Sequence, residues 1–159
     1  MKNISLVRID DRLIHGQVIT AWVKVFPVTK ILIIDNELAG NRLMSRIYRA
    51  AAPIGIEVLI KNEEDSINFI KEPPLKNEEI MILVKTPQVI ERLTQNEIPI
   101  SKIVLGGMGA RDDRKRFNRN ISVNQEEEDC LKRMLNNNIS IVYQLVPLET
   151  PMDLNNIIK

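Results

Sequence analysis

A polar segment near the amino terminus contains the only histidine of the chain, His15, together with four charged residues. The segment reads Arg-Ile-Asp-Asp-Arg-Leu-Ile-His-Gly-Gln over residues 8–17. Imidazole is a nucleophile, carboxylates can hold it in one orientation, and guanidinium groups bond phosphate oxygens strongly. A single histidine is more often structural than catalytic, so its position in the chain has to decide between these interpretations.

The position of His15 favours a role in binding or carrying an anionic group. An apolar run at residues 4–7 precedes the segment and an amphipathic stretch at residues 17–25 follows it, which predicts a strand, a loop and then a helix. Free backbone N–H groups and the helix dipole at such a helix start attract phosphate. We therefore expect Gly16 and Gln17 to contact a phosphoryl group carried by His15.

The charged residues of the segment have two possible roles. We expect Arg12 and Arg8 to bond the phosphate oxygens, and Asp10 or Asp11 to orient the imidazole. The alternative is that each aspartate forms an ordinary loop salt bridge with an arginine.

Motif spacing excludes several other chemistries. One histidine excludes an H-E-x-x-H protease and any multi-histidine zinc site, and no G-x-x-x-x-G-K-[ST] or G-x-S-x-G motif is present. We therefore expect no metal and no cofactor. The run Gly106–Gly109 lacks dinucleotide-binding spacing, so we interpret it as a tight turn, with lining of the same cleft as the alternative.

Three further features have both a structural and a functional interpretation. The basic segment at residues 111–119 is either a solvated loop or a docking surface for an acidic or phosphorylated partner, with Arg114 and Arg116 as its test residues. Trp22 is assigned to the core rather than to a ligand platform. Cys130 is assigned to a semi-buried helix position rather than to a reactive thiol.

Composition limits the class of protein. The chain has 159 residues, of which 44% are hydrophobic, and its net charge is +1. We expect a single domain over residues 1–159 and no nucleic-acid partner. The amino terminus lacks a signal peptide, and no apolar run approaches the length of a membrane span, so we expect a cytoplasmic protein.

Alternating patterns predict an α/β three-layer sandwich, a mostly parallel central sheet with helices on both faces. Apolar runs predict strands at residues 4–7, 30–34, 56–60, 80–84, 103–105 and 139–146. Amphipathic stretches predict helices at residues 17–25, 41–52, 63–71, 88–96 and 124–135. Ligands of such sheets lie at the carboxyl ends of the strands, where residues 8–16, 35–40, 85–88 and 106–119 form loops.

The segment at residues 8–18 resembles the signature loop of the mannose/fructose/sorbose family of phosphotransferase-system IIB components. Similarity continues at Trp22, at residues 33–36 and 51–53, and at residues 104–108, 121–123 and 144–147. Asn36 departs from the acid that many relatives carry, and residues 85–87 also vary. Neither departure touches the carrier loop.

The resemblance implies a phosphoryl carrier of the family fold. His15 would accept phosphate from a IIA phosphohistidine and pass it to a sugar moving through the membrane IIC and IID components. Asp10, Arg12 and Gly16 match the expected surroundings of this histidine. A homodimer is also consistent with the family, and the location would be cytoplasmic and peripheral at the membrane through IIC and IID.

Two other functions remain open at this point. A flavodoxin-like module could bind a phosphorylated ligand without being modified. A regulatory protein of the same fold could sense a phosphodonor and pass nothing to sugar.

Overall fold

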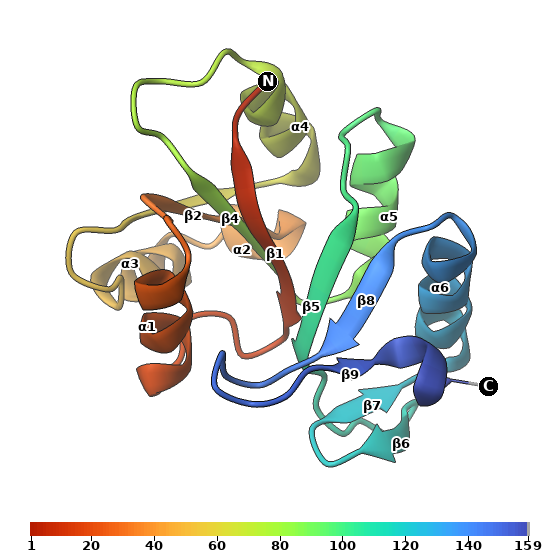
Figure 1. The fold of residues 1–159 in the computed structure, drawn as a ribbon. Coiled ribbons are helices and arrows are strands. Elements are labelled where there is room, and N and C mark those ends of the chain that lie inside the picture. Colours follow the sequence, from red (N-terminus) through yellow and green to blue (C-terminus); the bar gives the residue numbers. More distant parts are fainter. Residues whose placement is uncertain (159) are drawn as a thin grey trace.

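A seven-stranded sheet forms the centre of the computed structural model, which describes residues 1–158. The strand order is β3-β2-β4-β1-β5-β8-β9, and all pairs are parallel except β8 with β9. Helices flank the sheet on both sides (Figure 1). The predicted fold class, a mostly parallel sheet between two helical layers, is confirmed.

The elements follow the predicted alternation. The strands are β1 (Ile4–Asp10), β2 (Lys30–Ile34), β3 (Glu57–Lys61), β4 (Ile80–Val84), β5 (Lys102–Gly107), β6 (Lys115–Asn118), β7 (Ile121–Val123), β8 (Ser140–Tyr143) and β9 (Met152–Asp153). The helices are α1 (Gly16–Val25), α2 (Asn36–Ala39), α3 (Arg42–Ala50), α4 (Glu63–Lys71), α5 (Pro87–Gln95), α6 (Gln125–Asn136) and the 3-10 turn η1 (Leu154–Asn156).

Alternate residues of each central strand enter opposite cores, because successive strand side chains point to opposite faces. In β4, Ile80, Ile82 and Val84 face the core beneath α4, α5 and α6. Met81 and Leu83 face the core beneath α1, α2 and α3. Burial on both faces explains why these strands are continuous apolar runs in the sequence.

Side-chain caps fix several helix starts. Asn124 and Glu127 form a reciprocal capping box at α6, and the Asn62 side chain accepts a bond from the third backbone N–H of α4. Helix α1 has no such cap, and its N-cap residue is His15. The start of α1 therefore retains N–H groups that a ligand can use.

The structure also differs from the predicted boundaries. Strand β1 continues to Asp10, into residues expected as loop, and the segment at 106–119 includes β6, which pairs with β7 in a separate antiparallel ribbon. The short helix α2 and strand β9 were also missed. No helix within residues 1–158 combines the length and apolarity needed to cross a membrane.

Candidate functional site

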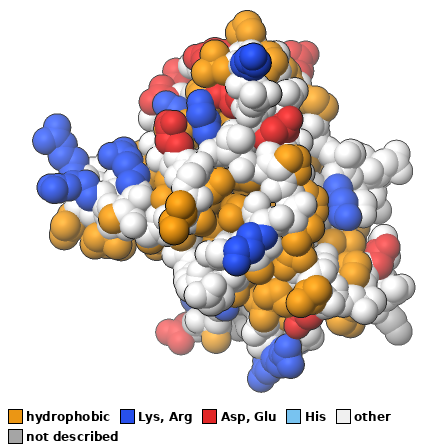
Figure 2. All heavy atoms as spheres, turned by 60° about the vertical axis from the view of Figure 1, so that its left-hand side comes forward, with side chains coloured by type: hydrophobic (Ala, Val, Ile, Leu, Met, Phe, Trp, Pro, Cys, Tyr) orange, Lys and Arg blue, Asp and Glu red, His pale blue; other side chains and the backbone are white. Residues whose placement is uncertain are grey.

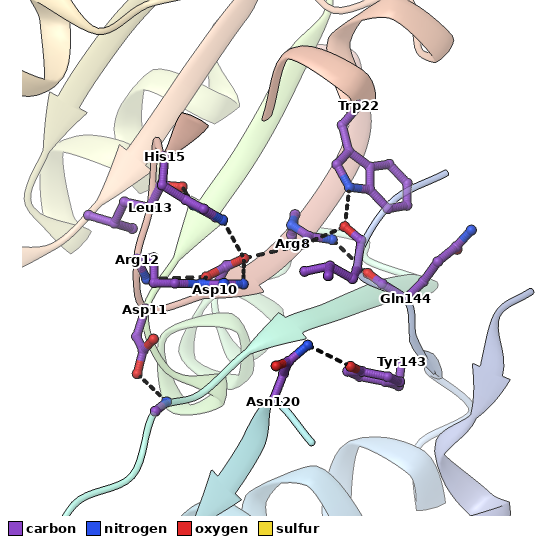
Figure 3. A network of polar contacts seen from close by, with 12 residues as sticks. Arg8, Asp10, Asp11, Arg12, Leu13, His15, Trp22, Asn120, Tyr143 and Gln144 are labelled. Carbon is purple, nitrogen blue, oxygen red and sulfur yellow. Dashed lines mark hydrogen bonds and ion pairs between the residues drawn. The ribbon is translucent and has the colours of Figure 1, made fainter. Parts of the chain in front are cut away.

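Asp10 is the centre of the site and lies at the carboxyl end of β1, beside Gly107 of β5. Its side chain is fully buried. The carboxylate accepts hydrogen bonds from the Arg8 guanidinium and from the backbone and side chain of Arg12 (Figure 3). These donors compensate the cost of burying the charge and fix the position of both arginines.

Arg12 presents a guanidinium group that is both anchored and accessible. Its Nε and Nη2 atoms lie 3.0 and 3.1 Å from the two oxygens of Asp10, a bidentate arrangement. Hydrogen bonding to Asp10 raises the pKa of Arg12, so the group stays charged. The side chain is 44% exposed, which leaves its remaining N–H groups available to an incoming anion.

Arg8 does not have the role that the sequence predicted. Its side chain is completely buried and donates to the backbone oxygens of Gln144 and Leu145, at 2.9 and 3.0 Å, as well as to Asp10. Burial lowers the pKa of Arg8, while Asp10 opposes that shift. Because the guanidinium is enclosed by protein, the prediction that Arg8 contacts phosphate is wrong. Arg8 instead supports Asp10 from beneath.

Two glycines make room for these arginines. A Cβ atom on Gly106 would lie 2.0 Å from Nη2 of Arg8. A Cβ atom on Gly107 would lie 2.8 Å from Nη2 of Arg12 and 3.0 Å from Oδ1 of Asp10. The tight-turn interpretation is wrong for Gly106 and Gly107, which end strand β5. The alternative is confirmed for Gly107 and Gly109, which line the hollow beside Asp11 and Arg12. Gly106 and Gly107 also allow the close approach of the Arg8 and Arg12 side chains.

A tight turn carries the chain from Asp10 to His15. Leu13 adopts a left-handed conformation, with φ 57°, and its N–H donates to the Asp10 carbonyl at 2.9 Å. Its side chain is fully buried, so core packing holds this disfavoured backbone conformation. The turn brings the Leu13 carbonyl within 2.9 Å of Nδ1 of His15.

The His15 ring faces oxygen at both nitrogens. Nδ1 contacts the Leu13 carbonyl, and Nε2 lies 3.8 Å from Oδ2 of Asp10 without a hydrogen bond (Figure 3). The Leu13 carbonyl was not anticipated, because backbone direction in a turn cannot be derived from residue types. The role predicted for Asp10 in orienting the ring stays a prediction, since the contact is an ion-pair distance.

The start of α1 lies directly after the imidazole. Gly16 and Gln17 are exposed, and Gly16 has a positive φ of 46°. The first turn of α1 has no side-chain cap, so its N–H groups can take part in the predicted anion contact. That contact itself stays a prediction.

Asp11 points away from His15, toward the loop after β5. It accepts bonds from the Gly109 N–H at 2.7 Å and from Arg114 at 3.1 Å. Arg114 also pairs with Glu127 of α6, and its side chain is only 2% exposed. The expectation that Arg114 belongs to a docking surface is therefore wrong, because its charge is buried and neutralised.

The other arginines of the basic segment remain accessible. Arg116 and Arg119 line a hollow of about 350 Å³ together with Arg12 and Asp11. The segment therefore borders the carrier loop through exposed Arg116 and Arg119 as well as through buried Arg114.

Residues 4–159 match the family described as PTS system sorbose subfamily IIB component. The chain belongs to this family. It is 28% identical over 156 residues to the mannose-specific EIIAB component of Escherichia coli (strain K12), covering 98% of this chain. It is 24% identical over 159 residues to the fructose-specific EIIB component of Bacillus subtilis (strain 168), covering 100% of this chain and 98% of that one.

A solved structure extends the similarity to the fold. The IIBSor domain of the sorbose permease from Klebsiella pneumoniae superposes with a TM-score of 0.94 at 25% identity, covering 98% of this chain and 96% of that one. The chain spans about half, 48%, of the length of the E. coli EIIAB component.

Two other sequence assignments for this IIB chain are confirmed. Trp22 is 1% exposed, donates to the Leu145 carbonyl at 2.8 Å and packs over Arg8, so it belongs to the core that supports the carrier loop. Cys130 lies in α6 as predicted but is fully buried rather than semi-buried, and burial raises the pKa of its thiol to about 12. The thiol is therefore protonated and unreactive at neutral pH.

Proposed function

We propose that His15 is the phosphoryl carrier of a sugar phosphotransferase system. It accepts a phosphoryl group from a phosphohistidine on a IIA component and passes it to a sugar. The observation that carries this proposal is the position of the only histidine, at an uncapped helix start beside the anchored guanidinium of Arg12. Membership of the IIB family supports it.

The transfer step is a displacement at phosphorus. One imidazole nitrogen attacks through its lone pair, forming an N–P bond as the N–P bond of the donor histidine breaks, and the donor nitrogen leaves with the electron pair. Delivery to the sugar repeats the step with a hydroxyl oxygen as nucleophile, whose proton leaves to solvent or a base. Family members need no metal or nucleotide at this step, which is consistent with the cationic surroundings of His15.

Attack on phosphorus requires a ring nitrogen whose lone pair faces the donor. Each nitrogen of His15 faces an oxygen, from Leu13 on one side and Asp10 on the other. A nitrogen that points at either oxygen cannot direct its lone pair at phosphorus. We infer that the side chain rotates toward the hollow side of the loop when a donor docks, and that Asp10 then stabilises the ring as it gains charge.

Arg12 and the start of α1 stabilise the transferred group. Phosphoryl transfer depends mainly on alignment and on stabilising charge over the three equatorial oxygens. Arg12 supplies a fixed guanidinium, and Gly16 and Gln17 supply the first N–H groups of α1. Asp10 and buried Arg8 act by holding Arg12 in place rather than by touching phosphate.

The partners follow from the proposed relay. The donor is a IIA component and the acceptor is a sugar in complex with membrane IIC and IID components. We propose that residues 1–159 form one IIB domain that works in the cytoplasm at the membrane surface, with a homodimer as a compatible assembly. The A and B names of the E. coli EIIAB relative support pairing with a IIA partner.

Single-turnover transfer from a phosphorylated IIA component tests this function. The wild type should become stoichiometrically phosphorylated, and His15→Ala should not. Arg12→Gln should slow the step on the order of a hundredfold, as expected for loss of one charge-stabilising donor. Arg111→Gln is the matched control, because that exposed arginine pairs with Asp113 outside the site. Stoichiometric binding of a phosphorylated compound without covalent labelling would instead support the binding module.

A further inference from the structure

The outer side of α3 carries positive charge that the protein does not neutralise. Arg42, Arg46 and Arg49 are all exposed, and their spacing places them along one side of the helix. Within residues 1–158 none of the three forms an ion pair with a carboxylate. The sequence from 41 to 56 contains no aspartate or glutamate.

Large aliphatic side chains lie next to this row of arginines, on the adjoining exposed side of the helix. Leu43 is 68% exposed, Ile47 is 50% exposed and Ile54, in the turn after the helix, is 104% exposed. Met44 and Tyr48 lie on the side of α3 that packs on the sheet, and buried Ser45 lies between that side and the arginines. Exposed aliphatic residues grouped in this way indicate an interaction surface. The basic face of α3 is defined here as Arg42, Leu43, Arg46, Ile47, Arg49 and Ile54.

A hollow among the arginines fits a phosphate group. Arg42, Arg46 and Arg49 line a hollow of about 390 Å³ together with Ala39 and Ser45. The Ser45 hydroxyl is already bonded to the Leu38 carbonyl, so the guanidinium groups are the donors available there. Guanidinium forks bind phosphate oxygens in pairs.

We propose that the basic face of α3 binds the phosphate headgroups of an anionic lipid bilayer. The arginines bond the headgroups, and the aliphatic side chains enter the boundary between headgroups and acyl chains. A second copy of this chain fits poorly, because a symmetric contact would bring two sets of unpaired arginines together. A bilayer places negatively charged headgroups next to apolar acyl chains, so it can bind this face without a matching pattern of carboxylates.

The placement of α3 suits a carrier that works beside a membrane. Helices α1 and α3 cover the same face of the sheet, and α1 begins directly after His15 (Figure 1). Figure 2 looks at this side, where blue side chains project from one flank beside orange ones. The choice of a bilayer as the partner rests in part on the proposed function, whereas the exposed charge and aliphatic side chains of α3 do not depend on phosphoryl transfer by His15.

Vesicle co-sedimentation with the full chain tests the proposal. Vesicles of phosphatidylglycerol and phosphatidylcholine should bind the wild type at low salt, and pure phosphatidylcholine vesicles should not. Arg42→Gln/Arg46→Gln/Arg49→Gln should weaken binding by about tenfold or more. Ile54→Ser should weaken it several-fold through lost apolar burial.

A second triple variant controls for net charge. Lys71→Gln/Lys76→Gln/Lys102→Gln removes the same charge from exposed positions away from α3 and should leave binding unchanged. All variants are first compared by circular dichroism and thermal unfolding. Transfer from phosphorylated IIA in solution should be unaffected by the α3 triple, which separates this proposal from the carrier function.

Three results would overturn the lipid proposal. The first is absence of wild-type binding to anionic vesicles at low salt. The second is an equal loss in both triple variants, which would indicate unspecific charge attraction. The third is binding of inorganic phosphate, seen by calorimetry and lost in the α3 triple, without vesicle binding; the hollow would then be a site for a free anion.

Discussion

The carrier loop at residues 8–17 and the basic face of α3 both contain arginines, but they use the charge in opposite ways. In the loop, Arg8 and Arg12 both bond Asp10, and one of them is completely buried. On α3 no arginine is paired with a carboxylate of residues 1–158, and all three are exposed. Paired charges fix geometry, whereas unpaired exposed charges are available to a partner.

The same contrast separates sequence neighbours in the basic segment. Arg114 is enclosed between Asp11 and Glu127 and ties the loop after β5 to the carrier loop and to α6. Arg116, two residues later, is exposed and lines the hollow beside Arg12. A run of like charge in a sequence can therefore divide between structure and recognition. If this division is correct, removing buried paired charges should lower the free energy of unfolding, and removing exposed charges should not.

The largest effect is expected at Asp10. Asp10→Asn removes the counter-charge of buried Arg8, and the free energy of unfolding should fall by about 3–5 kcal/mol. Urea unfolding followed by circular dichroism measures this loss. Asp112→Asn is the control, because that exposed carboxylate forms no ion pair within residues 1–158, and it should leave the unfolding midpoint unchanged. Equal midpoints for both variants would contradict the structural role of the Asp10 cluster.

A smaller loss is expected at Gly106. The added methyl of Gly106→Ala would overlap the Arg8 guanidinium, which three bonds hold in place, so the free energy of unfolding should fall by about 2 kcal/mol. Gly40→Ala is the control, since its nearest neighbour would be an ordinary contact at 3.6 Å. Thermal unfolding of the two variants distinguishes close packing from a general requirement for glycine.

A third cluster of paired charge, around Glu78, should make the free energy of unfolding fall at acid pH. Glu78 is buried between Lys2 and Lys30, at 2.9 and 2.5 Å. Burial alone would raise the pKa of Glu78, but hydrogen bonds from the two lysines lower it to about 2, from an ordinary 4.5.

The sign of this dependence follows from proton binding. Because the folded-state pKa is the lower one, the stabilisation is present above pH 4.5 and is lost as the pH falls toward 2. Glu78→Gln should have a lower free energy of unfolding than the wild type at neutral pH. Urea titrations at several pH values should show that this free energy depends less on pH in the variant. Glu57→Gln, at an exposed position, should keep the wild-type profile. A Glu78→Gln profile parallel to that of the wild type would contradict the assignment.

The smallest effect on stability is expected on α3. Because no internal ion pair is broken, Arg42→Gln/Arg46→Gln/Arg49→Gln should change the free energy of unfolding by no more than about 0.5 kcal/mol. Urea unfolding of this triple variant and of Asp10→Asn, at the same protein concentration, compares the two changes in the free energy of unfolding. A loss of several kcal/mol would show that these charges hold the fold, and the contrast between the two regions would disappear.

Most of the fold was predictable from sequence because its strands are buried on both faces. The predicted bounds of β2 and β4 were correct to the residue, because an apolar run flanked by turns leaves few possible positions for the ends of a strand. The ribbon of β6 and β7 was missed because β6 begins with two exposed basic residues, Lys115 and Arg116. Its sequence therefore lacks the alternation of apolar and polar residues that predicts a strand.

The sequence predicted which residues make up the candidate site, but not how deeply each side chain is buried. Asp10, Arg12, His15, Gly16 and Gln17 come together as expected, since they are close in sequence. Arg8 was misplaced because a buried guanidinium requires the carbonyls of Gln144 and Leu145, which the chain supplies 136 and 137 residues later. Residue types give no signal for such a backbone contact.

The central claim is that His15 carries the phosphoryl group, and its direct test is to locate that group. The protein is phosphorylated with phosphoenolpyruvate, the general phosphotransferase proteins and a cognate IIA component, digested near neutral pH and mapped by tandem mass spectrometry. We expect one acid-labile phosphoryl group, on His15. A phosphoryl group on any other residue, or none from a donor shown to be phosphorylated and cognate, would contradict it.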